Sequence, residues 1–185
     1  MHVGRLAVRV AIGSLFIGHG TQKLFGWFGG PGLEGTEGMM TSLNLHPPRR
    51  NALAAGIVET AGGALVVAGL ATPLAAAGLI GSMTTAIRKV HWANGPWAAN
   101  GGYEYNLVLI AALTALVETG PGDMSLDALL GRKLSGPAWA LAALAAGAAS
   151  SAVVIALGSS SAPAAPTGPA TTPYPDTAGD PVTSD

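Results

Sequence analysis

The sequence predicts an all-α integral membrane protein, built as a bundle of four transmembrane helices with a fifth, C-terminal transmembrane helix. Charged residues make up 10% of the chain, against about 25% in ordinary soluble domains, and hydrophobic residues make up 49%. The apolar residues fall into five segments of helical length, separated by stretches rich in glycine, proline and polar residues. A soluble bundle would need more charged residues than this to cover its surface. The composition therefore favours helices that lie in lipid.

The first apolar segment spans residues 6–25 and carries Arg9, His19 and Lys23 within it. Its basic start, apolar middle and the small residues around His19 also resemble a cleavable signal peptide. However, apolar and aromatic residues resume directly after Lys23 and continue to Trp27, as in a helix that ends in an interfacial aromatic belt. We therefore expect this segment to remain in place as the first transmembrane helix.

The second and third segments, residues 52–70 and 73–87, are predicted to form a helical hairpin. The second segment follows a pair of prolines, which a preceding helix could hardly pass. A link of only two residues, Ala71 and Thr72, joins the second segment to the third. The two segments and their link contain a single formally charged residue, Glu59, and about 20 residues suffice to cross a bilayer. This stretch is therefore long enough for nearly two antiparallel spans.

The fourth and fifth segments, residues 105–117 and 137–157, differ in length and polarity. The fourth is short for a full span and is expected to gain a turn from its neighbours. The fifth contains no charged residue, and we expect no polar group to turn inward from it, so that lipid can solvate it fully. The prediction is that the first four helices pack as one bundle and the fifth lies at its periphery.

These segments divide the chain into three parts. Residues 1–130 are predicted to form the four-helix membrane domain, and residues 131–157 the additional transmembrane helix. Residues 158–185 are rich in Pro, Ser, Thr and Ala, with one aromatic residue, Tyr174. A segment of this composition cannot bury enough apolar surface to offset the entropy of ordering, so a disordered tail is expected.

The loops place several polar residues on one side of the membrane. Because successive helices alternate in direction, the two long loops at residues 28–50 and 88–102 share a side, and the loop at 120–136 lies opposite. Basic residues are divided almost evenly between the two sides, so the positive-inside rule gives no firm orientation. The polar tail after an odd number of spans favours an N-terminus in the cytoplasm, with the long loops outside.

The candidate catalytic residues are His19, Lys23 and Glu59. His19 and Lys23 are four residues apart, which puts them on one face of a helix, one turn apart. A charge near the centre of a bilayer costs at least about 2.5–3.5 kcal/mol, so such residues usually face other helices and are paired. Glu59 lies about 12 Å along the second helix at the standard rise, at a depth similar to His19. We expect the three to be in mutual contact, either as a functional site or as a structural ion pair.

His91, Tyr103 and Glu104 are the candidate cofactor-binding residues near the mouth of this site. Two of them also have a simpler interpretation: Glu104 complements a helix dipole, and Tyr103 belongs to an aromatic belt. No HExxH or ExxH spacing supports a metal site, so none is predicted. Imidazole and carboxylate groups in a pocket open to lipid suit proton transfer to a quinone headgroup.

Several function classes are excluded by what the sequence lacks. The chain contains no cysteine, which excludes disulfides, thiolate catalysis and cysteine-ligated iron–sulfur or zinc sites. It has no phosphate-binding loop, nucleophile elbow or dinucleotide fingerprint, and no haem, flavin or iron–sulfur pattern. A net charge of −1 and the lack of basic runs give no reason to expect nucleic-acid binding. Arg5 and Arg9 are expected to extend to the opposite interface.

Five short motifs together resemble the DoxX family. These are HGTQKLFGWFGG after an arginine-containing apolar start, Glu59 before a glycine pair, His91 after the third helix, GGYEYNL, and GPGDMSLD. The resemblance covers about residues 5–130. It implies a four-helix membrane bundle from a family named for a subunit linked to thiosulfate:quinone oxidoreduction, with relatives associated with membrane redox complexes and oxidative-stress handling. The segment at 137–157 and the tail depart from that pattern.

The expected function is a multi-pass plasma-membrane subunit of a redox complex, a quinone-linked oxidoreductase with protein partners in the bilayer. Because the chain has no cysteine, any thiol–disulfide chemistry would belong to a partner. The alternative is a non-enzymatic membrane scaffold or small transporter in which the polar cluster is structural. The sequence alone does not separate these two functions.

Overall fold

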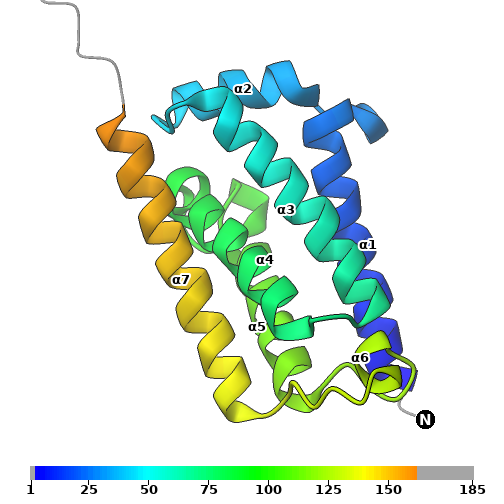
Figure 1. The fold of residues 1–185 in the computed structure, drawn as a ribbon. Helices are drawn as coiled ribbons and strands as arrows, with labels where there is room; N and C mark the ends of the chain where they lie inside the picture. Colours follow the sequence, from blue (N-terminus) through cyan, green and yellow to red (C-terminus); the bar gives the residue numbers. More distant parts are fainter. Residues whose placement is uncertain (1–2, 162–185) are drawn as a thin grey trace, which may run out of the picture.

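The computed structural model describes residues 3–161, and all regular secondary structure within that range is helical (Figure 1). Five long helices run up and down, namely α1 (Val3–Phe25), α3 (Pro48–Ala68), α4 (Thr72–Ala86), α5 (Glu104–Thr119) and α7 (Pro137–Ser160). The all-α prediction is confirmed. The predicted tail began too early, because residues 158–160 are the last residues of α7, and residues 162–185 lie outside the described range.

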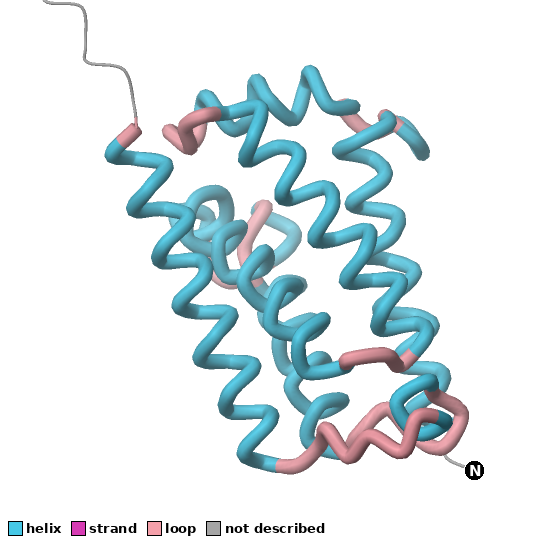
Figure 2. The backbone as a smooth tube through the Cα atoms, viewed as in Figure 1, coloured by secondary structure: helices cyan, strands magenta, loops and turns pink. Residues whose placement is uncertain are grey.

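Shorter helices lie at the two ends of the long ones, where the sequence predicted loops (Figure 2). Within the predicted loop at 28–50, α2 (Gly32–Ser42) lies across one end and packs on α3 and α1. At the other end, α6 (Leu126–Leu129) is a single turn. Three glycines in α2 lower its helix propensity, which is why composition alone predicted a loop there.

The helical hairpin of α3 and α4 is present as predicted. Pro48 occupies the first turn of α3, where its missing N–H leaves no helical hydrogen bond unmade. Gly69 ends α3 in the left-handed conformation, with φ of 64°, which glycine adopts without a steric penalty. The chain then turns directly into α4.

The helices pack mainly as two pairs, α1 with α3 and α4 with α7, which are joined through α3–α4 and α4–α5 contacts. Helix α7 is therefore the principal neighbour of α4, and a four-plus-one bundle is not confirmed. Ser151 explains part of this difference, because it is 1% exposed and its hydroxyl bonds that of Thr85 on α4 at 3.0 Å. The expectation that α7 turns no polar group inward is wrong.

The α1–α3 contact is close because glycines face one another across it. A Cβ placed on Gly13 would lie 2.6 Å from the carbonyl oxygen of Gly63, and one on Gly63 would lie 2.6 Å from that of Gly13. Small residues at such positions let helix backbones approach closely, which is how helices associate in lipid. The hydrophobic core lies between the long helices and includes Phe16, Leu79 and Leu113.

The closed end of the molecule, opposite α2, is fixed by Arg9. The side chain is 2% exposed, and its Nε and Nη1 atoms donate to the carbonyls of Val66, Pro121 and Met124 at 2.7–3.0 Å, while Nη2 donates to Val67. The prediction that Arg9 extends to the interface is wrong. Its guanidinium instead satisfies carbonyls at the end of α3 and in the loop after α5.

Asp127 stabilises the same end from α6. It is 1% exposed, and its carboxylate accepts hydrogen bonds from the backbone N–H groups of Ala71 and Thr72 and from the Thr72 hydroxyl at 3.0–3.1 Å. This carboxylate therefore caps the N-terminus of α4, where the helix dipole favours negative charge.

Two helices of the described part are long and apolar enough to cross a membrane, α3 and α7. Only 22% of the most apolar window of α7 is buried inside the protein, which leaves most of its surface for lipid. Helices α4 and α5, at 15 and 16 residues, are shorter than the roughly 20 residues of a typical span. A π-helical turn, η2 (Ile87–His91), lengthens α4 at the end near α2.

Candidate functional site

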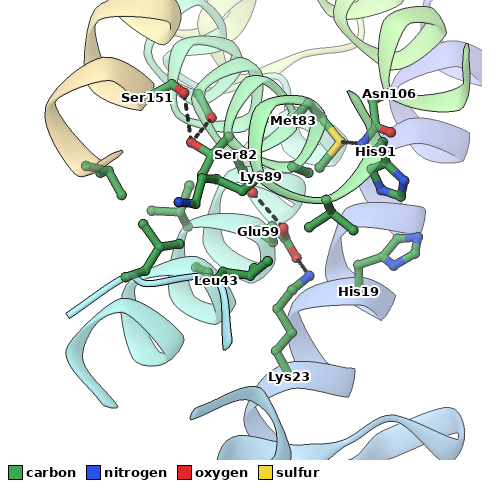
Figure 3. Close-up of a pocket in the computed structure, with 18 of the residues that line it drawn as sticks. His19, Lys23, Leu43, Glu59, Ser82, Met83, Lys89, His91, Asn106 and Ser151 are labelled. Carbon is green, nitrogen blue, oxygen red and sulfur yellow. Dashed lines mark hydrogen bonds and ion pairs between the residues drawn. The ribbon is translucent and has the colours of Figure 1, made fainter. Parts of the chain in front are cut away.

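A cavity of about 690 Å³ lies among the long helices towards the end covered by α2 (Figure 3). Its walls come from α1, α3, α4, α5 and α7, and the end of α2 and the turn after it add Met39, Met40, Leu43 and Leu45. A volume of this size is in the range of about 300–1,000 Å³ that small-molecule sites occupy. The lining is mainly apolar, with a few polar side chains at defined places.

Lys23 and Glu59 form an ion pair at the wall of this cavity. The Lys23 ammonium donates to Oε2 of Glu59, and Ser82 on α4 donates to Oε1 at 2.7 Å (Figure 3). Glu59 is 2% exposed, whereas the Lys23 side chain is 20% exposed. Both carboxylate oxygens therefore have donors, and the pair ties three helices together at one point.

Glycines one turn away bring the two charged side chains within reach of each other. Gly20 lies three residues before Lys23, and Gly56 lies three residues before Glu59, so each shares a face with its charged neighbour. A Cβ on Gly20 would lie 2.7 Å from the carbonyl oxygen of Gly56. The close approach of α1 and α3 at this level thus places Lys23 against Glu59.

His19 lines the same cavity but lies outside the ion pair. It makes no hydrogen bond to Lys23 or Glu59, and its ring lies 6.5 Å from that of Tyr105 on α5, tilted by 51°. The residue is exposed, and in Figure 3 its ring lies to the right of the Lys23–Glu59 pair. Of the three predicted catalytic residues, the structure brings two together and leaves the third at the edge of the cavity.

The predicted cofactor-binding residues take different places. His91 lines the cavity, and its Nδ1 is hydrogen-bonded to the Gly101 carbonyl at 2.7 Å. Tyr103 stacks on Trp92 with ring centroids 5.6 Å apart, and Glu104 accepts a hydrogen bond from the Ala98 N–H at 2.8 Å. Neither Tyr103 nor Glu104 lines the cavity. Their contacts stabilise the loop at the mouth of the cavity, which contributes Ala98, Gly101 and Gly102 to the lining.

Sequence reasoning missed several polar residues of the cavity. Ser82, Thr85 and Lys89 lie at spacings of three and four residues, so they share one face of α4 and its π-helical extension. This helical spacing is the pattern by which the sequence could have identified them as one polar face. Asn106 on α5 is also buried at the lining, where its amide nitrogen lies 3.3 Å from the sulfur of Met83. Among residues 3–161, no group of three or more His, Asp or Glu side chains is arranged to hold a metal.

Comparison with known families shows that residues 4–92 match the DoxX family. The matched residues make up just under half of the 185-residue chain. The resemblance predicted from the sequence motifs is therefore confirmed for α1 to the end of η2, which includes Lys23, Glu59, Ser82 and Lys89. No curated protein and no solved structure matches the chain. The match to DoxX and the two apolar helices together indicate a membrane protein.

Helices α5 and α7 lie beyond the matched residues, although both complete the cavity. Tyr105, Asn106 and Leu109 come from α5, and Ser150, Ser151 and Val154 from α7. The region that matches DoxX therefore supplies the charged residues of the site, and the C-terminal helices close the space around them.

Proposed function

We propose that the chain is a multi-pass plasma-membrane protein that binds a quinone headgroup in this cavity and serves as a subunit of a membrane redox complex. One observation carries the proposal, namely the Lys23–Glu59–Ser82 cluster at the wall of a mainly apolar cavity. A quinone has the matching character, with an apolar body and two carbonyl oxygens that accept hydrogen bonds.

The ion pair supplies the groups that quinone reduction needs from the protein. Reduction of a quinone to a quinol takes up two electrons and two protons. In the proposal a partner redox protein supplies the electrons, and the Lys23 ammonium donates a hydrogen bond to one quinone oxygen. Glu59, held by Ser82, transfers protons between this oxygen and water, because a carboxylate within hydrogen-bond reach acts as an acid and a base.

In this proposal, the other predicted site residues assist the Lys23–Glu59 pair. His19 beside Tyr105 stands at the edge of the cavity, where an imidazole can exchange protons with the second quinone oxygen. His91 stands at the mouth, on the loop that Tyr103 and Glu104 hold in shape. These roles follow from position, and the ion pair remains the centre of the site.

Direct quinone binding to the purified protein tests the proposal. Short-chain ubiquinone or menaquinone is titrated into the protein in lipid nanodiscs, and binding is followed by quenching of tryptophan fluorescence. We expect saturable binding that is weakened about tenfold by Glu59→Gln, which corresponds to about 1.4 kcal/mol. Glu34→Gln, at an exposed position of α2, is the matched control and should bind like the wild type. Absence of saturable binding by the wild type would overturn the proposal.

A structural role for the polar cluster is the second candidate. The Lys23–Glu59 pair joins α1 to α3, and Ser82 adds α4, which is the arrangement expected of a membrane scaffold. This function predicts that Glu59→Gln lowers thermal stability while the wild type binds no quinone. Quinone binding by the wild type therefore separates the two functions, because both predict that Glu59→Gln lowers stability.

A further inference from the structure

The positive and negative charges of the residues that line the cavity are unequal in number. The charged lining residues are Lys23, Glu59 and Lys89. Lys23 and Glu59 neutralise each other, so Lys89 leaves the lining with one net positive charge while the histidines are neutral. Within the described range of 3–161, Lys89 has no ion-pair partner and no hydrogen bond through its ammonium group.

The position of Lys89 keeps it away from the one carboxylate of the described lining. Lys89 lies in η2 on the wall built by α4, whereas Lys23 reaches Glu59 from α1 (Figure 3). Both oxygens of Glu59 already accept hydrogen bonds, from Lys23 and from Ser82. The hydroxyls of Thr85 and Ser151 on the α4–α7 wall bond each other and carry no charge.

A half-buried ammonium in an apolar cavity favours a ligand of opposite charge. Removing an ammonium from water without a partner is costly, and a negative group beside it offsets that cost. Basic pockets between transmembrane helices near the membrane surface are sites where acidic headgroups bind. A neutral ligand in this cavity would displace water from Lys89 and leave its charge uncompensated.

We propose that Lys89 forms an anion subsite, and that the cavity binds an amphiphile with one negative charge next to an apolar body. The inference deepens the proposed function and rests on it only in taking this cavity as the ligand site. Among quinones, the inference predicts that negatively charged ones bind best, such as the anion of a hydroxyquinone. The apolar body would lie against the lining residues Met39, Met40, Leu43, Val58, Leu109 and Val154.

Two naphthoquinones that differ in charge test the subsite. A 2-hydroxy-3-alkyl-1,4-naphthoquinone is an anion at pH 8, and its 2-methoxy derivative is neutral and of similar shape. Both are titrated into the protein in nanodiscs of phosphatidylcholine, which has no net charge. We expect the wild type to bind the anion about tenfold more tightly, and Lys89→Met to remove this preference.

Two further variants control for charge and for folding. Lys89→Arg keeps the positive charge and should retain the preference for the anion. Arg88→Gln removes a neighbouring exposed cation that does not line the cavity, and should also retain it. If Arg88→Gln instead removes the preference, or Lys89→Met keeps it, the preference arises from the surface and the subsite is wrong.

Oleate and oleyl alcohol form a second ligand pair, which separates this inference from the proposed function. Equal binding of both naphthoquinones to the wild type would overturn the anion subsite while leaving quinone binding in place. Binding of oleate but of neither naphthoquinone, with loss in Lys89→Met, would support the subsite and overturn the quinone proposal. If none of the four ligands binds, both are wrong.

Discussion

Two cations on α1 show how the same kind of side chain serves different purposes at the two ends of the molecule. Arg9 is buried at the closed end and donates to backbone carbonyls. Lys23 stands at a cavity and donates to a carboxylate on another helix. The guanidinium has enough donors to satisfy several carbonyls at once, whereas the single ammonium remains accessible from the cavity. The first is therefore structural, and the second is available to a ligand.

The ion pair predicts an asymmetry between its two members. Lys23→Met leaves the buried Glu59 carboxylate without its cation, and should lower the free energy of unfolding by about 3–5 kcal/mol. Glu59→Gln leaves Lys23, whose side chain is partly exposed and can be hydrated, so its cost should be about 1–3 kcal/mol. Unfolding in SDS measures both values. Equal losses would contradict the unequal burial of the two residues.

Arg9 predicts a large effect far from the cavity. Arg9→Lys keeps the charge but cannot reach the carbonyls of Val66, Pro121 and Met124 together, so at least one is left without a donor. Each buried group left unpaired costs about 1–3 kcal/mol. We expect a clear fall in thermal stability with unchanged quinone affinity in the protein that remains folded. Arg5→Lys, at a half-buried position of the same helix, should have little effect.

At the scale of elements, the α1–α3 contact determines whether the ion pair can form. Gly13→Ala would force a Cβ to within 2.6 Å of the Gly63 carbonyl oxygen, and overpacking of this kind typically costs about 1–3 kcal/mol. Gly18→Ala is a matched control in the same helix, because no atom lies within 4 Å of the added Cβ. It should be neutral or stabilising, by up to about 1 kcal/mol. Thermal unfolding of the two variants tests this, and a greater loss in Gly18→Ala would contradict the packing.

The long helices could be predicted from the sequence because apolar runs and proline or glycine boundaries identify them. The pair of Lys23 and Glu59 could be anticipated from matched depth alone. The position of His19 could not be anticipated in this way. Two residues that share one face of a helix still point in somewhat different directions, so only one of them needs to reach the same partner. The burial of Arg9 depends on carbonyls of α3 and of the loop after α5 meeting at one point, which no local pattern records. Helix α2 depends likewise on its packing against α3.

At the scale of the whole molecule, the arrangement predicts five membrane crossings. All five long helices run between the same two ends of the molecule (Figure 1), and α2 lies across the end where the cavity is found. An odd number of crossings places the two chain ends on opposite sides, and we predict the N-terminus in the cytoplasm. A reporter enzyme that is active only outside the cytoplasm, fused after Asp185, should be active. If a reporter that works only in the cytoplasm is active when fused after Asp185, this topology is wrong.

The central claim is that the cavity at Lys23 and Glu59 is a quinone site, and photo-crosslinking tests it most directly. An azidoquinone is illuminated with the protein in nanodiscs, and the modified peptides are mapped by mass spectrometry. We predict labelling of cavity-lining residues on α1, α3 and α4 that excess quinone suppresses and Glu59→Gln weakens. Labelling confined to the lipid-facing surface of α7, or unaffected by excess quinone, would contradict the account.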